Sequence, residues 1–262
     1  MPKVAILSDI HANLPALTAV LEDVKKAGIT EIYCGGDTVG YAAKPNDCVN
    51  LVRQHGGRSV LGNHDYYVNA VIADAENIPA GNSWIDNPVW AGVIFAARGL
   101  SDDNAQWLSK LPSFLKIPGG ILSHASLHFQ DQWPYLHSYS DAAPTLEILE
   151  KTDEGIGFFG HTHQQTFFAE RGGAVMARRL GFSRVHLPQG VVCAVLVGSV
   201  GQPRDDDARA AWVIWDSDAR VVEFRRTEYN ALETARQIID AGLPEMSAIR
   251  LLDDVAAAKF RR

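Results

Sequence analysis

KVAILSDIH, residues 3–11, is the stretch that decides the fold. Its apolar run Val4–Leu7 is short and unbroken, which is typical of a parallel strand buried on both faces. A helix is predicted next, because Asn13 suits an N-cap, Pro15 suits a first turn and Gly28 suits a helix end. A buried strand that passes through polar residues into a helix is the first half of a β-α-β unit.

The same rhythm continues along the chain. Strands are predicted at 31–34 and 58–61 with a helix from 45 to 55 between them, which favours a parallel sheet. Later strands are expected at 120–123, 155–159, 166–170, 191–197, 211–215 and 221–228, with some antiparallel pairing. Helices are expected at 88–99, 101–112, 231–241 and 247–259, and a long loop at 124–140. No repeat, linker or domain boundary is evident, so we expect one domain over 1–262 with C-terminal helices from about 230.

Composition excludes several classes of protein. The chain has 262 residues, is 47% hydrophobic and carries a formal charge of −7, so long nucleic acid is not an expected partner. Its three cysteines, Cys34, Cys48 and Cys193, are odd in number and widely spaced, so we expect reduced core residues. No apolar run is long enough for a membrane span and no targeting leader precedes the first strand, so a cytoplasmic protein without a membrane partner is expected. The oligomeric state stays open.

Polar motifs follow the predicted strands. They are D-x-H at 9–11, G-D at 36–37, G-N-H-D at 62–65, S-H-A at 123–125 and G-H-T-H at 160–163. Ligands of open α/β sheets bind outside the carboxyl ends of the strands, so these groups are expected to meet at one edge. Two aspartates, an asparagine and four histidines are then candidate metal ligands: Asp9, His11, Asp37, Asn63, His124, His161 and His163.

These donor types point to a definite chemistry. Mixed carboxylate, amide and imidazole donors suit borderline divalent cations such as Mn, Fe or Zn. Seven donors are enough for two ions, and an adjacent pair of ions can clamp both the attacking and the leaving oxygen of a phosphate ester. Taken alone, each motif could be a turn, a surface group or a satisfied core histidine.

The ordered set of motifs resembles the calcineurin-like metallophosphoesterase superfamily over roughly residues 3–200. The segments 36–46 and 198–204 are similar to its bacterial phosphodiesterase-like branch. The resemblance implies an α/β fold, a four-layer α/β/β/α sandwich of mixed sheets. It further implies one ion on Asp9, His11, Asp37 and His163, and a second on Asp37, Asn63, His124 and His161. His64 would face the substrate without binding metal, and a protonated His64 could act as general acid on the leaving oxygen.

The chain also departs from relatives. The superfamily's protein phosphatases carry Asp, Arg and Arg where this chain has Gly40, Tyr41 and Leu61, so protein phosphatase activity is not favoured and what orients His64 is left open. Trp133, Tyr135 and Arg204 are candidate substrate contacts. Loop packing is an equal alternative for the two aromatic residues, and a structural turn with a surface side chain is an equal alternative for the arginine.

The expected function is hydrolysis of a small phosphodiester through a metal-bound hydroxide. Phosphomonoesterase and dinucleoside-polyphosphate hydrolase activities are the alternatives within enzymes. A non-catalytic metal-binding scaffold is the alternative outside them, and the presence of His64 with all seven candidate ligands disfavours it.

Overall fold

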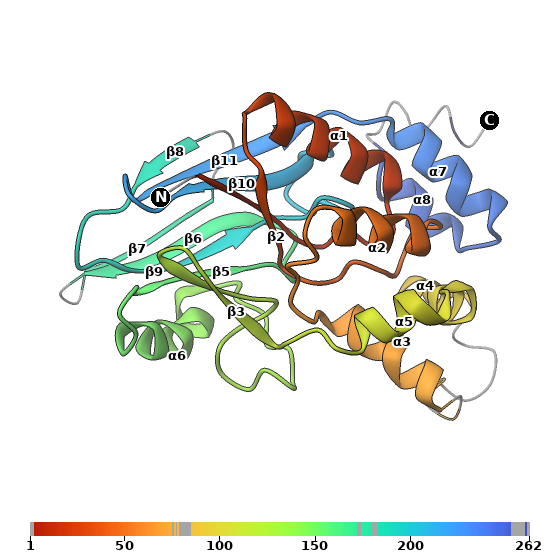
Figure 1. Ribbon diagram of the computed structural model, residues 1–262, viewed down its shortest axis with the longest axis horizontal. Helices are drawn as coiled ribbons and strands as arrows, with labels where there is room; N and C mark the ends of the chain where they lie inside the picture. The colour runs from red at the N-terminus through yellow and green to blue at the C-terminus, as the bar shows by residue number, and fades with distance from the viewer. Residues whose placement is uncertain are drawn as a thin grey trace.

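The computed structural model describes residues 3–74, 76, 78, 85–171, 174–179, 183–252 and 260. Its centre is a pair of stacked mixed β-sheets (Figure 1). The first has the strand order β2-β1-β10-β11-β8 and the second β3-β4-β5-β9-β6-β7. The strands are β1 Val4–Leu7, β2 Glu31–Cys34, β3 Phe114–Ile117, β4 Gly120–Ser123, β5 Ile156–Phe159, β6 Gln165–Arg171, β7 Ala174–Arg179, β8 Ser183–His186, β9 Val192–Val197, β10 Ala210–Asp216 and β11 Val221–Thr227.

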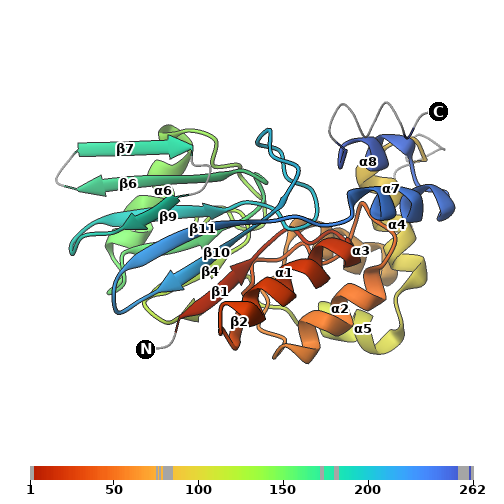
Figure 2. The ribbon, with the colours of Figure 1, turned by 90° about the horizontal axis from the view of Figure 1, so that it is seen from above.

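Helices cover the outer faces of both sheets and complete the four predicted layers. Helix α1 packs on the first sheet through residues such as Leu17 and Val20, and α6 packs on the second through Leu146 and Leu149 (Figure 2). The helices are α1 Leu14–Lys26, α2 Pro45–Gln54, α3 Asn63–Ala73, α4 Pro88–Gly99, α5 Asp102–Leu108, α6 Tyr139–Glu150, α7 Ala231–Asp240 and α8 Glu245–Ile249. The α/β/β/α sandwich predicted from the sequence is therefore confirmed.

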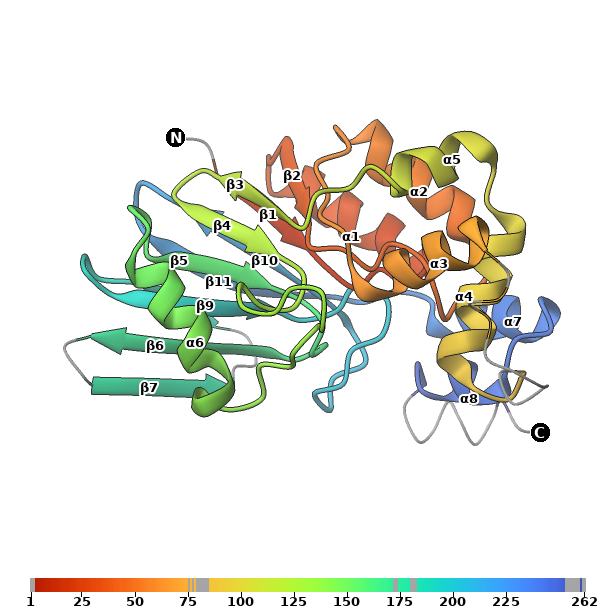
Figure 3. The ribbon, with the colours of Figure 1, turned by 90° about the horizontal axis from the view of Figure 1, so that it is seen from below.

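The two sheets face each other across an apolar core. Phe158 of β5 and Trp215 of β10 are fully buried there, with ring centroids 5.4 Å apart. Helices α3, α4 and α5 lie at the same end of the molecule as α7 and α8, away from β6 and β7 (Figure 3). The core therefore holds two sheets in a fixed relation, and loops from both can build one site.

Parallel pairing places the site at the strand ends. β1 pairs parallel with β2, while β4, β5 and β9 run parallel in the other sheet. The loops after these strands are joined directly, because Gly35 N–H donates to Leu7 O at 2.6 Å and Gly160 N–H donates to His124 O at 2.8 Å. The motifs that follow the strands consequently share one edge.

Some local predictions are wrong. Residues 58–61 form no named strand, because only Ser59 makes an isolated bridge to Cys34 before the chain turns toward α3. The other neighbour of β1 is the antiparallel β10, so the sheet is mixed rather than parallel. The long loop ends at Ser138, whose side chain caps α6; this helix was not predicted, nor were β3, β7 and β8.

Other predictions hold or fall partly outside the described residues. The helices expected at 88–99 and 231–241 are α4 and α7, with Asn87 capping the former as expected. The helix expected at 247–259 overlaps α8, Glu245–Ile249, and residues 253–259 lie outside the described residues. All three cysteines are buried and free, as predicted. In the described part of the chain, no helix has the length and apolarity needed to cross a membrane.

Candidate metal centre

Strained backbone marks the strand-end loops. Non-glycine residues rarely adopt positive φ, and each such conformation costs on the order of 1–3 kcal/mol unless its surroundings enforce it. Five of the seven candidate ligands have it: Asp9, His11, Asp37, His161 and His163. Two backbone bonds tie two of these loops together, Asp9 N–H to Gly36 O at 3.0 Å and His11 N–H to Asp37 O at 2.9 Å. The turns aim the polar side chains inward at a conformational cost.

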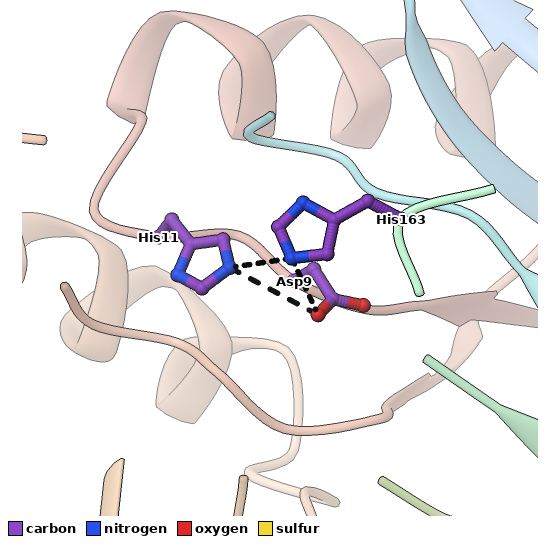
Figure 4. Close-up of side chains that lie close together, drawn as sticks. All are labelled: Asp9, His11 and His163. Atoms are coloured by element: carbon purple, nitrogen blue, oxygen red, sulfur yellow. Dashed lines mark hydrogen bonds and ion pairs between the residues drawn. The ribbon is translucent and has the colours of Figure 1, made fainter. Parts of the chain in front are cut away.

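One set of donors comes from the loops after β1 and β5. Asp9, His11 and His163 lie together and are all buried (Figure 4). Nε2 of His163 is 3.3 Å from Asp9 Oδ1 and 3.1 Å from Nε2 of His11. Two ligands of one ion, each about 2.1 Å from it, are separated by about 3–3.4 Å at octahedral or tetrahedral angles. Two of the three separations match this range, and the third, between His11 Nε2 and Asp9 Oδ1, is wider at 3.9 Å.

Asp37 connects this set to a second one. Its Oδ2 is 3.7 Å from His11 Nε2 and 3.4 Å from His124 Nε2. His124 Nε2 is in turn 3.1 Å from Asn63 Oδ1. The other oxygen, Oδ1, accepts from His64 N–H at 2.8 Å, which leaves Oδ2 turned toward both histidines. One carboxylate oxygen thus lies between two groups of donors.

Outer hydrogen bonds orient the imidazoles. Nδ1 of His11 donates to Val39 O, Nδ1 of His124 to Gly35 O and Nδ1 of His163 to Gln202 O. A carbonyl can only accept, so each ring carries its proton on Nδ1 and presents a lone pair on Nε2 toward the other donors. Metal-binding histidines generally have such a partner on the second nitrogen.

His161 is held differently. Its Nε2 donates to the backbone oxygen of Trp133 at 3.0 Å, which leaves the lone pair on Nδ1. Its backbone N–H lies 3.1 Å from both oxygens of Asp9. The ring of His161 is 5.1 Å from that of His124, on the side of the second set.

The buried aspartates of the centre have an electrostatic environment that favours the binding of cations. Burial raises the pKa of Asp9 to about 7, and burial together with Asp65 raises the pKa of Asp37 well above its ordinary range. Among the described residues, no lysine or arginine forms an ion pair with either aspartate. Burial also lowers the pKa of His11 and His163, which keeps both rings neutral. Buried carboxylates without cationic partners beside neutral imidazoles fit divalent metal ions.

His64 lies against this centre with one nitrogen unused. Its ring packs against those of His11 and Tyr41, with centroids 4.7 Å and 4.6 Å away, and its Nδ1 is buried with no hydrogen-bond partner among the described residues. A Cβ at Gly40, which has φ +94°, would collide with this Nδ1. Ring packing and the close approach of a glycine therefore hold His64, and this answers the question that the sequence leaves open about what orients it.

The charge of His64 differs from the expectation. Burial lowers its pKa to about 3, so the imidazole is neutral near pH 7 rather than protonated. A neutral ring still carries one N–H. One nitrogen of His64 also lies within 4.8 Å of donor atoms of His11 and Asp37, so the ring is within reach of the centre.

Arg204 joins the site from the loop after β9. Its Nη2 donates to Tyr41 Oη at 3.1 Å and to Gln202 Oε1 at 2.9 Å. Its Nε is buried and has no partner among the described residues. Burial is the main cause that lowers the pKa of His11 and of His163, and the nearby guanidinium of Arg204 lowers both further. Arg204 thus brings positive charge and a free donor to the side of the first set.

The two aromatic candidates occupy different positions. Trp133 meets the ring of His124 edge-on, with centroids 5.8 Å apart. Tyr135 stacks on His161 at 3.9 Å and 20°, and also on His137 at 5.0 Å and 6°. Both come from the loop between β4 and α6, which therefore borders the second set.

Two supports of the site were not predicted. Asp65 is fully buried and accepts from the backbone N–H groups of Gly62, Thr38 and Val39, which fastens the Asp37 loop to the start of α3. The loop at 198–204 supplies Ser199, whose hydroxyl donates to Asp9 O at 2.8 Å, and the Gln202 carbonyl that orients His163. Asp65 lies inside the G-N-H-D motif, and Ser199 and Gln202 lie inside the segment 198–204 that resembles the phosphodiesterase-like branch. These two stretches are the signal that could have found them.

Comparisons with known proteins agree with this geometry. The family model for calcineurin-like phosphoesterases matches residues 2–165. A protein of Methanocaldococcus jannaschii described as uncharacterised, MJ0912, is 33% identical over 253 residues, covering 95% of this chain and 96% of its own. The crystal structure of a metallophosphoesterase from Sphaerobacter thermophilus has a TM-score of 0.81 at 30% identity, covering 95% of this chain and 98% of that one. The hypothetical protein PH1004 of Pyrococcus horikoshii shares the fold, with a TM-score of 0.75 at 18% identity and coverage of 96% and 98%.

The fold and the buried cluster of carboxylates and imidazoles define a metal-dependent phosphoester hydrolase. The chain belongs to the calcineurin-like phosphoesterase family. That family depends on metal ions and acts on small phosphorylated substrates. The resemblance stated from the five motifs is confirmed.

Proposed function

We propose that this chain is a phosphodiesterase that uses two divalent ions, Mn, Fe or Zn, to hydrolyse a small phosphorylated molecule. The observation that carries the proposal is the position of Asp37 Oδ2, 3.7 Å from His11 Nε2 and 3.4 Å from His124 Nε2. An oxygen placed between two donor groups supports a pair of ions that share this carboxylate. Such ions, when bound, supply Lewis acidity toward phosphoryl oxygens and activate water near neutral pH.

The ligand sets follow from the donor positions. The first ion would be held by Asp9, His11, Asp37 and His163, and the second by Asp37, Asn63, His124 and His161. The outer bonds of Nδ1 in His11, His124 and His163 support these roles, because they turn a lone pair toward the centre.

Two further residues would act on the substrate. The buried Nε of Arg204 has no protein partner among the described residues, so it can donate to a phosphate oxygen. His64, neutral near pH 7, would donate a hydrogen bond from its single N–H to the leaving oxygen and so stabilise the charge that develops there, and the packing of its ring fixes the direction of that donor.

The charge around the centre favours a diester over a monoester. A phosphodiester carries one negative charge, whereas a monoester near neutral pH carries close to two. The family's protein phosphatases carry charged residues at three positions where this chain has the uncharged Gly40, Tyr41 and Leu61. Arg204 is the cation whose charge lowers the pKa of His11 and His163. A single nearby arginine suits the substrate with less charge.

Metal stoichiometry and a substrate panel test the proposal together. Protein stripped of metal and reloaded with Mn²⁺ should hold two ions per chain and cleave bis(4-nitrophenyl) phosphate faster than 4-nitrophenyl phosphate or a dinucleoside polyphosphate. Asp37→Asn should weaken both ions, whereas Asp9→Asn should weaken mainly one. One ion per chain at full activity, or no cleavage of any ester by loaded protein, would contradict the proposal.

His64→Ala separates chemistry from metal binding. The variant should keep both ions and lose about 10²–10³-fold in kcat, the range for removing one preorganised hydrogen-bond donor to a developing negative charge. An unchanged kcat would remove His64 from the mechanism. Faster cleavage of the monoester or of the polyphosphate would select one of these alternative activities in place of the diesterase.

A further inference from the structure

An exposed pair of aromatic rings borders the candidate centre. Tyr66 lies in the first turn of α3 and Trp133 in the loop between β4 and α6, yet their ring centroids are 6.2 Å apart. Tyr66 is 50% exposed and Trp133 is half-buried. Rings that stay open to solvent contribute little to the core. Packing in the core therefore does not account for the contact between Tyr66 and Trp133.

The pair lies on one side of the centre. Trp133 meets His124 edge-on with centroids 5.8 Å apart, and Tyr66 comes three residues after Asn63. Both therefore border the Asn63–His124 set of donors. Arg204 contacts Tyr41, whose ring is 4.7 Å from that of His11, so the positive charge lies with the first set. A phosphoryl group between the two sets would have a cation toward one side and aromatic rings toward the other.

Tyr135 does not contribute to this surface. Its ring is nearly parallel to those of His161 and His137, at 3.9 Å and 5.0 Å between centroids, so stacking within the protein already occupies its faces. Of the two alternatives that the sequence leaves open for Tyr135, packing is the one that its neighbours favour. Tyr135 is 46% exposed, but imidazole rings lie along its faces, so Trp133 and Tyr66 are the pair that we consider for a ligand.

We infer that Trp133 and Tyr66 form a stacking site for a planar ring of the substrate, an aryl group or a nucleobase attached to the phosphate. Every such ring has a π-face that stacks on an aromatic side chain, so the site selects rings without reading a particular base. The inference rests on the proposed phosphodiesterase function and narrows it to esters in which at least one group is planar and aromatic.

Equilibrium binding tests the stacking site without needing turnover. Mn²⁺-loaded protein is titrated by calorimetry with adenosine 5′-monophosphate, phenyl phosphate and inorganic phosphate. Trp133→Leu should weaken binding of a ring-bearing probe about tenfold or more, since stacking on one aromatic side chain is typically of that size, and should leave inorganic phosphate unchanged. Trp133→Phe should restore most of the lost affinity. A loss confined to adenosine 5′-monophosphate identifies a nucleobase site, and a loss confined to phenyl phosphate an aryl site.

Phe129→Leu is the matched control. Phe129 lies in the same loop, has positive φ like Trp133 and is 66% exposed, and the ring contact found for it is with His128. Affinity for all three probes should stay at the wild-type value, and thermal melting should show all variants folded. Equal affinity of Trp133→Leu and wild type for the ring-bearing probes overturns the inference, as does a wild-type protein that binds none of them. Cleavage of diesters with no role for Trp133 refutes the stacking site alone, whereas ring-dependent binding without cleavage refutes the proposed function alone.

Discussion

Asp65 offers the sharpest test of how the fold supports the centre. Its carboxylate is fully buried, with Oδ1 3.0 Å from Thr38 N and 3.3 Å from Val39 N, and Oδ2 3.1 Å from Gly62 N. It thereby joins the loop after β2, which carries Asp37, to the first turn of α3. Asp65→Asn preserves the size of the side chain and replaces one acceptor oxygen by an amide donor.

The magnitude follows from the contacts. The amide oxygen of the variant can keep the bonds from Thr38 and Val39, while its NH₂ group faces the N–H of Gly62. A hydrogen bond to a charged group contributes about 1.5–3 kcal/mol, and an unsatisfied buried donor costs about 1–3 kcal/mol. Burial raises the pKa of Asp65, so removing the charge returns part of this free energy. We expect a net loss of about 2 kcal/mol in the free energy of unfolding.

The metal centre should respond as well. Because Asp65 holds the loop that positions Asp37, its loss should lower the affinity for Mn²⁺ by about 10–100-fold, the usual effect of disturbing an outer partner. Urea unfolding of stripped protein measures the first effect and calorimetric titration with Mn²⁺ the second.

Asp216→Asn controls for the substitution itself. Asp216 accepts a backbone bond from Ala219 at 3.0 Å and ends β10, beside the start of β1 and away from the centre. This variant should lose well under 2 kcal/mol and keep its Mn²⁺ affinity. The reasoning fails if Asp65→Asn unfolds at the same urea concentration as wild type and binds Mn²⁺ equally tightly.

Two further predictions use the packing and the pKa of single residues. Gly92→Ala in α4 should destabilise the protein by more than about 2 kcal/mol, although helices usually prefer alanine, because the new Cβ would collide with the backbone of Tyr41. In the control Gly99→Ala, in the same helix, the new Cβ meets nothing within 4 Å, so the variant should be neutral or stabilised by up to about 1 kcal/mol. Thermal or urea unfolding measures both effects. Burial raises the pKa of Asp9 to about 7, so a proton competes with the ion below that pH. The Mn²⁺ affinity should therefore rise by about 50-fold between pH 5 and pH 7, steeply at first and less steeply near pH 7, with proton release detected by calorimetry in two buffers. An affinity independent of pH would contradict this assignment.

The centre was predictable because its signals are local in the chain. Four of the five motifs follow a strand, and the general placement of ligands at the carboxyl ends of strands was enough to bring Asp9, Asp37 and His124 to one edge. The error at residues 58–61 is one of extent, because this segment bonds to Cys34 at the end of β2 through Arg58 and Val60 but the pairing covers a single bridge and forms no strand. Helix α6 was missed because Pro144 lies inside it, a residue that ordinarily ends a helical pattern.

Other features depend on neighbours that are distant in the chain. The partner of Asp37 Oδ1 is the N–H of His64, 27 residues away, and the partner of His163 Nδ1 is a carbonyl 39 residues away. Backbone carbonyls leave no trace in a residue pattern, so these contacts could not be read from it. The same holds for the stacking of Tyr135 on His161, which assigns the tyrosine to packing.

The amino-acid sequence by itself determined the family through its five ordered motifs, and the layered architecture followed from that resemblance. It also determined the donor types, because residue chemistry is a property of the chain. Only the tertiary structure decided which nitrogen of each imidazole faces inward, that Asp37 Oδ2 lies between two donor groups, and that His64 is held by ring packing beside Gly40. The physical reason is that orientation and charge state arise from desolvation and from partners that meet only when both sheets have stacked.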